Sequence, residues 1–356
     1  MLTLSFTRLF TVLAFVLLTA NTSGQTIKVL DSGQSASFRG ISVASASEAW
    51  VSGSQGTVIR TTDSGATWTK IDVPDSAELD FRDIEVLPDG TLILMSIGNG
   101  STSKLFRSDD HGATWTTVLQ NHDEAAFFDG IAFHRDGKRG VLFGDPVNGL
   151  MDLYLTKDGG QTWVRLPDSQ RPKMADGEFG FAASGTGVAW TDQGIEIATG
   201  GTVARIHQTK SEGKTWNTIQ TPLLTGRPSA GIFSMAVQNN RIVIVGGDYL
   251  KPKEAGINVA ISNDHGTTFQ IPTDNQLQHK ACVRMIGQSQ LVACGRTGVD
   301  VSENAGQTWT HLSDDSYYTM DVDQASGVVF LAGPKGSVAI LSQTSKSKSE
   351  SETESK

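Results

Sequence analysis

Short apolar runs, separated by turns rich in glycine, aspartate and serine, make up most of this chain. Runs such as 38–43 and 49–53 carry β-branched and aromatic residues and end at small or polar ones. Residues of these types favour strands, and glycine with aspartate or serine favours the tight turns between them. No long stretch keeps the spacing of an amphipathic helix. The pattern therefore predicts an all-β protein.

One phrase, Ser/Thr-x-Asp-x-Gly-x-Thr-Trp or a near variant, occurs six times, and we call these segments the box turns. They cover 61–68, 108–115, 156–163, 209–216, 262–269 and 302–309. Their closing aromatic residues lie 40 to 53 residues apart. Because such a period is typical of blade repeats, the sequence predicts one four-stranded sheet per copy and hence a β-propeller.

The phrase has a physical explanation. Its Ser or Thr ends a strand, its acidic residue accepts hydrogen bonds from the backbone of a tight turn, and its Gly supplies a positive φ. Its Trp fills the gap between neighbouring blades. The acceptor position holds Asp63, Asp110, Asp158, Ser211, Asp264 and Asn304. Because Ser and Asn replace Asp in two copies, we interpret the position as structural rather than catalytic.

The number of blades follows from the strands that precede each box turn. Two apolar runs come before every copy, and the fourth pair begins at 179–182. A seventh set at 317–321, 328–333 and 337–340 has no box turn after it, so it lacks an outer strand. The run 26–30 resembles the outer strands elsewhere and can supply it. We predict seven antiparallel blades, closed by pairing of the N-terminal strand with the C-terminal blade, because six would leave strands unused.

The ends of the chain differ in composition from the repeats. Arg8 precedes the apolar run 9–18, so residues 1–24 are predicted to be a secretory signal, the alternative being an uncleaved N-terminal anchor. Residues 25–342 form the single propeller domain, and 343–356, which have no apolar residue, are expected to be a disordered tail. The expected location is secreted, periplasmic or extracellular.

A net charge of −9 argues against general affinity for nucleic acid. We expect a monomer with no stable membrane insertion once the signal is removed, with no cofactor and no metal site, since the histidines are scattered. The only cysteines, Cys282 and Cys294, lie in two strand-like runs joined by 287–290. In an exported protein they are predicted to form a disulfide within one hairpin, the alternative being two buried thiols.

Candidate chemistry lies where the first strand of each blade begins, because these strands line the centre of a propeller and the loops before them form one face. The polar residues there are Arg39, Arg82, Asp129, Glu178, Arg284 and Tyr317. A second set comes from the ends of second strands and nearby, at Asp145, Asp248, Arg296 and Arg205. The alternative is a network of opposite charges that only rigidifies the ring.

The box turns resemble the Asp-box, or BNR, repeats of sialidases, several glycoside hydrolases and the photosystem II stability/assembly factor group, within the wider set of WD40/YVTN-like propellers. The resemblance covers nearly all of 26–342. The Phe-Arg-x-Ile pattern at 38–41 and 81–84 is similar to the assembly factors. That resemblance implies a scaffold that binds a protein partner through an arginine patch, here Arg39, Arg82 and Arg284, with the box turns away from the ligand face.

A glycan-active hydrolase is the alternative function, with a glycan as ligand. Residues 38–41 resemble the Phe/Tyr-Arg-Ile-Pro element of sialidases. This resemblance implies an arginine clamp and a nucleophile such as Tyr317 or Tyr249. Asp129, Asp145 and Glu178 are the candidate catalytic carboxylates of a two-carboxylate hydrolase.

Overall fold

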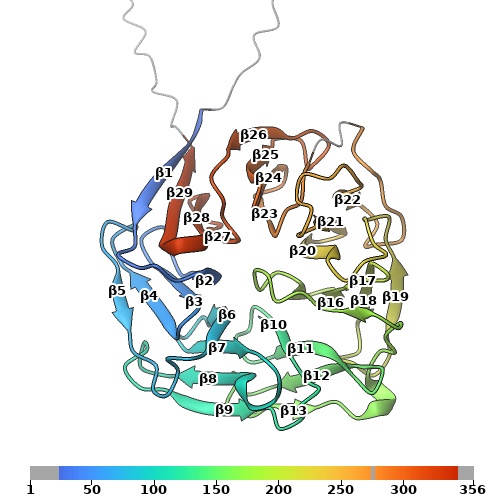
Figure 1. Ribbon diagram of the computed structural model, residues 1–356, viewed down its shortest axis with the longest axis horizontal. Helices are drawn as coiled ribbons and strands as arrows, with labels where there is room; N and C mark the ends of the chain where they lie inside the picture. The colour runs from blue at the N-terminus through green and yellow to red at the C-terminus, as the bar shows by residue number, and fades with distance from the viewer. Residues whose placement is uncertain (1–23, 274–276, 344–356) are drawn as a thin grey trace, which may run out of the picture.

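The computed structural model describes residues 24–273 and 277–343, which form a ring of seven antiparallel sheets (Figure 1). The predicted all-β class and the seven blades are confirmed. In the described part, helical structure is confined to three single turns, η1 (Gly100–Thr102), η2 (Asp168–Gln170) and η3 (Pro334–Gly336). None of the described residues forms a helix long and apolar enough to cross a membrane. The predicted signal and tail lie, apart from Gly24 and Gln343, outside these residues.

Five blades have four strands each, ordered from the centre outward. Blade 1 contains β2 (Phe38–Val43), β3 (Ala49–Gly53), β4 (Thr57–Thr61) and β5 (Thr69–Ile71). Blade 2 contains β6 (Asp80–Val86), β7 (Leu92–Ile97), β8 (Lys104–Ser108) and β9 (Thr116–Gln120). Blade 3 contains β10 (Phe128–Phe133), β11 (Gly140–Val147), β12 (Leu150–Thr156) and β13 (Val164–Arg165). Blade 6 contains β23 (Cys282–Ile286), β24 (Gln290–Gly295), β25 (Gly298–Ser302) and β26 (Thr310–Ser313).

Blade 7 closes the ring. Its strands are β27 (Thr319–Asp323), β28 (Val328–Ala332), β29 (Ser337–Gln343) and, outermost, β1 (Gln25–Asp31). Seven residue pairs join β1 to β29, from Gln25 opposite Gln343 to Asp31 opposite Ser337. Figure 1 shows the two ends of the chain side by side, blue against red. This confirms the predicted closure, which leaves neither β29 nor the ring with an open edge at this point.

Blades 4 and 5 depart from the predicted pattern. Blade 4 contains β15 (Val188–Thr191), β16 (Gly194–Ala198), β18 (Arg205–Thr209) and β19 (Asn217–Gln220). Blade 5 contains β20 (Ala230–Gln238), β21 (Arg241–Asp248) and β22 (Val259–Ser262), and Ile261 opposite Gln270 is the single bridge to its outer segment. Two short strands, β14 (Glu178–Phe179) and β17 (Gly200–Gly201), extend its sheet.

The prediction that 179–182 begins blade 4 is therefore wrong. The innermost strand of that blade is β15, and residues 180–187 form a loop. The reason lies in composition, because Gly180, Ala182, Ala183, Gly185 and Gly187 offer little side-chain surface to pack on a pleated sheet.

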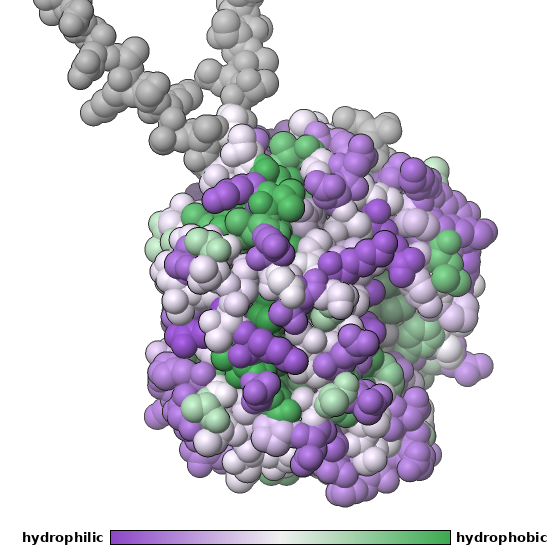
Figure 2. Space-filling model, turned by 60° about the vertical axis from the view of Figure 1, so that its left-hand side comes forward, coloured by the Kyte–Doolittle hydropathy of each residue, from purple (hydrophilic) through white to green (hydrophobic). Residues whose placement is uncertain are grey.

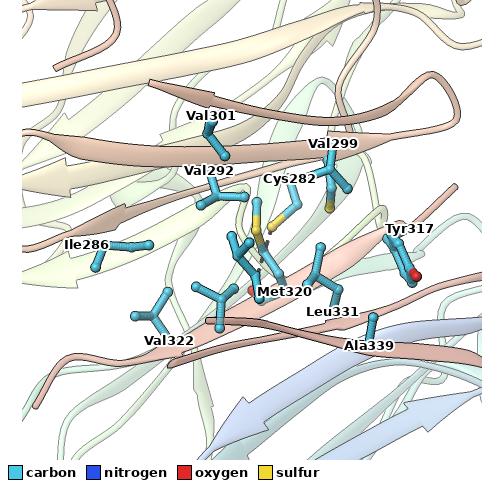
Figure 3. Close-up of a cluster of buried hydrophobic side chains, with 13 residues drawn as sticks. Cys282, Ile286, Val292, Val299, Val301, Tyr317, Met320, Val322, Leu331 and Ala339 are labelled. Carbon is cyan, nitrogen blue, oxygen red and sulfur yellow. Dashed lines mark hydrogen bonds between the residues drawn. The ribbon is translucent and has the colours of Figure 1, made fainter. Parts of the chain in front are cut away.

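Apolar packing occurs between blades, with one buried cluster at each of the seven interfaces. Each box-turn aromatic joins the cluster between its own blade and the preceding one. Trp68, for example, packs where blades 7 and 1 meet, and Trp309 where blades 5 and 6 meet. Blade 7 has no box turn, and its interface with blade 6 is filled by Tyr317, Met320 and neighbouring aliphatic side chains (Figure 3).

The box turns share one hydrogen-bond pattern. At Asp110, Oδ1 accepts from the Ser108 hydroxyl at 2.8 Å and from the Thr114 N–H at 2.8 Å. The same positions are joined at Ser211, which accepts from the Thr215 N–H at 3.0 Å, and at Asn304. The turn thus needs an acceptor at this position and not a charge.

The outer wall of the ring carries mostly polar side chains. Figure 2 shows the side on which β1 and β5 lie, where apolar residues appear only as small areas between hydrophilic ones. Scattered apolar residues of this kind are ordinary for a protein surface.

We predict that Gly160→Ala destabilises the protein more than Gly149→Ala. Both glycines have a positive φ, +80° and +76°, but an added Cβ at Gly160 would lie 2.6 Å from Ile93 Cδ1 of the preceding blade, whereas none of the described atoms lies within 4 Å at Gly149. Strain alone costs about 1 kcal/mol at each site, and the overlap adds about 2 kcal/mol at Gly160. Urea unfolding of the two variants measures the difference, and equal losses would contradict the packing role.

Candidate functional site

A pocket of about 540 Å³ lies at the end of the ring where first strands begin and second strands end. Its charged lining residues come from five blades and are Arg39, Arg82, Asp129, Asp145, His279 and Arg296. Since each box turn joins a third strand to a fourth, the box turns lie at the opposite end of the ring. The sequence prediction had placed most of these charged residues on one face.

The loop 180–187 forms the floor of this pocket and lies near the centre of the ring (Figure 1). It is tied to several blades at once. Arg82 Nη1 donates to the Ala182 carbonyl at 3.0 Å, and the Ser184 hydroxyl donates to the Ala281 carbonyl at 2.8 Å. The Thr319 hydroxyl of blade 7 donates to the Ser184 carbonyl at 3.1 Å. The floor is therefore held in one conformation by blades 2, 6 and 7.

Positive charge in the pocket is only partly neutralised. Arg82 pairs with Asp80 at 2.6 Å. Arg39 has no acidic partner among the described residues; its guanidinium lies over the Tyr318 ring, 3.9 Å from the centroid. Burial, with Arg82 nearby, lowers the pKa of Arg39 to about 10. Arg296 is exposed and makes no ion pair with a residue in 24–273 or 277–343.

Two aspartates on the pocket wall form a carboxyl pair. Asp129 is buried, and its carboxyl group and that of Asp145 are hydrogen-bonded to each other. Burial raises the pKa of Asp129 well above its ordinary range, and the Asp145 charge raises it further. Burial also raises the pKa of Asp145 to about 6, although the Gly180 N–H donates to its Oδ1 at 3.1 Å. At neutral pH the pair therefore holds one proton and one negative charge.

Glu178 and Arg205 lie away from this pocket, which corrects the prediction that Glu178 lies where first strands line the centre. Glu178 is buried and forms an ion pair with Arg205. It also lies 3.0 Å from His207 Nε2 and accepts from the Thr199 hydroxyl at 2.7 Å. Burial opposes ionisation, but the bonds from His207, Arg205 and Thr199 lower the pKa of Glu178 to about 2. These contacts are those of a structural ion pair.

Three other candidates also lie outside the pocket lining. Asp248 is buried and bonded to Arg227 at 2.7 Å. Arg284 donates through Nε to the Met320 carbonyl at 3.2 Å and lies 3.4 Å from Asp321. Tyr317 is buried between blades 6 and 7 (Figure 3), and the next residue, Tyr318, lines the pocket instead.

The sequence prediction missed the aromatic wall of the pocket. Phe181 and Phe233 stack with their centroids 3.9 Å apart, and the His279 ring lies edge-on to Phe233 at 4.6 Å. Phe179 and Tyr249 complete the wall. Two aromatic residues within a stretch of glycine and alanine, at 179–187, were the available signal, because such side chains have no neighbours in their own segment to pack against.

The predicted disulfide is absent. Cys282 and Cys294 lie directly opposite each other on β23 and β24, and both are buried free thiols. Cys282 Sγ lies 3.7 Å from the Met320 carbonyl (Figure 3) and 3.8 Å from the Thr186 hydroxyl of the loop 180–187. These contacts hold the sulfur as a thiol among polar groups. Among the described residues, no group of three His, Cys, Asp or Glu side chains could hold a metal ion.

Comparison with known proteins agrees with the fold. No protein-family model matches the chain, and no curated protein matches it in sequence. The structure is similar to that of YCF48 bound to D1 peptide, with a TM-score of 0.61, 14% identity, and coverage of 90% of this chain and 96% of that one. It is also similar to YCF48 from Cyanidioschyzon merolae, with a TM-score of 0.61, 14% identity, and coverage of 89% and 98%. The WD40 domain of Pan2 from Neurospora crassa has a TM-score of 0.59, 13% identity, and coverage of 88% and 91%. These similarities show the propeller fold.

We predict that Glu178→Gln lowers the free energy of unfolding by about 3 kcal/mol at pH 7, because it leaves Arg205 buried beside a neutral partner. The folded pKa lies below the ordinary value of 4.5, so the carboxylate's contribution is present above pH 4.5 and is lost as the pH falls toward 2. Denaturant unfolding from pH 7 to pH 3 measures this. An undiminished stability in the variant would contradict the structural role.

Asp145→Asn is expected to have the opposite effect. The folded pKa of about 6 lies above the ordinary 3.8, so wild-type stability falls as the pH rises from 4 to 6. The variant should therefore be more stable than the wild type at pH 8, by up to about 3 kcal/mol, and equal to it at pH 4. Asp176→Asn, at an exposed carboxylate, is the matched control and should show no such pH dependence. A gain that is the same at both pH values would contradict the raised pKa.

Proposed function

We propose that this protein is a protein-binding scaffold that holds a segment of its partner in the pocket at this end of the ring. The observation that carries the proposal is the combination of Arg39 and Arg296, which lack acidic partners in the described chain, with an aromatic wall around an open 540 Å³ cavity. Arginine and aromatic residues are the side chains that contribute most to protein interfaces.

The rigidity of the site supports this proposal. The pocket floor is bonded to blades 2, 6 and 7, and Tyr318 lies beneath the Arg39 guanidinium. A partner segment would therefore meet a surface that is already in place, so that little conformational entropy is lost on the scaffold side. A loop without such ties would have to be ordered at the moment of binding.

The comparisons and the sequence resemblance point the same way. YCF48 has been solved with a D1 peptide, and the chain resembles the photosystem II assembly factor group in its Phe-Arg-x-Ile pattern. We propose that the six box turns are Asp-box repeats, which maintain the ring and leave the opposite face for the partner. We also propose that residues 1–24 direct export and that the mature protein acts as a monomer.

A glycan-active hydrolase is less well supported by the pocket. Asp129 and Asp145 are hydrogen-bonded to each other, whereas the two carboxyl groups of glycosidases are usually about 5 Å apart or more. Glu178 is held by Arg205 and His207, away from the pocket. Arg284 does not join Arg39 and Arg82 there to form a three-arginine clamp.

We predict that Arg296→Glu weakens peptide binding at least tenfold, because it replaces an exposed cation at the pocket by an anion. Random linear peptides displayed on phage would be selected on immobilised residues 25–343, and the enriched peptides synthesised and titrated by fluorescence anisotropy. Enriched sequences should combine acidic with aromatic or aliphatic residues. Arg39→Gln should weaken the same peptides.

Arg135→Glu is the matched control. Arg135 is 79% exposed and lies in the hairpin at the other end of blade 3, where it pairs with the exposed Asp192. This variant should bind the peptides as the wild type does. Selection of no peptide above background, or equal losses in Arg135→Glu and Arg296→Glu, would contradict the proposal. Hydrolysis of an aryl glycoside that is lost in Asp145→Asn would instead favour the hydrolase.

A further inference from the structure

His279 stands out among the polar residues of the pocket because its hydrogen-bonding capacity is unused. Its side chain is buried, with 3% of the residue exposed, and it lines the cavity between Phe233 and Arg296. Neither Nδ1 nor Nε2 has a hydrogen-bond partner. A buried polar group without a partner costs about 1–3 kcal/mol, so the folded protein keeps this arrangement at a measurable loss of stability.

The charges that face His279 come from several elements and are mostly positive. Burial lowers its pKa to about 3, and Arg296 after β24, Lys280 beside it and Arg39 on β2 lower it further. Asp248, at the end of β21, acts in the opposite direction but is already paired with Arg227. The imidazole is therefore neutral in the unliganded protein at any pH at which the protein is stable.

An anionic group in the pocket would reverse this balance. We propose that the pocket binds a carboxylate attached to an aromatic or large apolar group, and that His279 takes up one proton when that carboxylate binds beside Arg296 and Arg39. The carboxylate supplies the negative charge and the acceptor that His279 lacks, and the apolar group packs against Phe181 and Phe233. This inference rests on the proposed function, since it names the chemistry that a partner segment would present there.

A second titrating group lies in the same pocket and must be separated from His279. The Asp129–Asp145 pair loses or gains a proton near pH 6, and it would respond to an anion by keeping its proton. Measurements of affinity against pH alone would combine both effects. A readout specific to the His279 ring, together with the Asp145→Asn variant, separates them.

Nuclear magnetic resonance of residues 25–343 labelled with ¹³Cε1-histidine supplies this readout. His279→Gln assigns the resonance. N-acetyl-phenylalanine is the probe, and N-acetyl-phenylalaninamide, which has the same ring and no carboxylate, is its matched control. The probe's carboxylate stays ionised above pH 5.

In the free protein the His279 signal should not titrate between pH 8 and pH 5. With saturating N-acetyl-phenylalanine it should titrate with a midpoint raised by two or more pH units, while the amide leaves it unchanged. If the bound midpoint is near pH 6, the acid binds about tenfold more tightly at pH 5 than at pH 7. This change should persist in Asp145→Asn and disappear in His279→Gln.

Two outcomes would overturn the inference. Equal binding of the acid and the amide would remove the carboxylate site, and binding of the acid with an unmoved His279 signal would remove the proton uptake. The result also separates this inference from the proposed function. If acid binding protonates His279 but phage selection yields no peptide, the anion site stands and the scaffold role fails; if peptides bind and the acid does not, the reverse holds.

Discussion

The structure depends on the contact between each blade and the one before it. A ring of sheets has no common core, so both faces of every blade must be buried against its neighbours, and one apolar cluster lies at each interface. The box glycines belong to this constraint. Gly65, Gly160 and Gly213 leave room for Leu30, Ile93 and Leu166 of the preceding blade, at positions where a Cβ would come within 2.6 Å. Their positive φ values and this close approach together explain why the phrase contains Gly in every copy.

The pocket is a consequence of one place where the repeat fails. In the other blades the apolar run before the second strand forms the innermost strand, but 180–187 has too little side-chain surface to do so and lies across the centre as a loop. Its carbonyl groups are then available to Arg39 and Arg82, which donate to Ala183 and Ala182. The loop also brings Phe181 onto Phe233. A regular fourth blade would have provided neither the floor nor the aromatic wall.

Features that repeat could be predicted from the sequence, whereas single contacts between distant segments could not. The blade number, the closing strand and the place of Arg39, Arg82, Asp129 and Asp145 follow from periodicity. The interchange of Tyr317 and Tyr318 is a shift of one residue, and adjacent residues in an extended segment point to opposite sides. Glu178 was misplaced because its partners Arg205 and His207 lie about thirty residues further along the chain and carry no local signal. The cysteines were placed correctly in one hairpin, but chain position says nothing about the surroundings that hold Cys282 as a thiol.

The contrast between satisfied and unsatisfied polar groups separates structural from functional charges in this ring. Glu178 is bonded to Arg205, His207, Thr199 and the Ala175 N–H. At the pocket, Arg39 Nε, Asp129 Oδ2 and both nitrogens of His279 are buried without hydrogen-bond partners. Single unsatisfied atoms occur elsewhere, as at Glu196, whose carboxyl burial raises its pKa to about 8. Three such residues around one open cavity are a different situation, because a ligand there could satisfy several of them at once. A network whose only purpose was to rigidify the ring would have paired these groups with one another, since the pocket already contains both carboxyl groups and guanidinium groups.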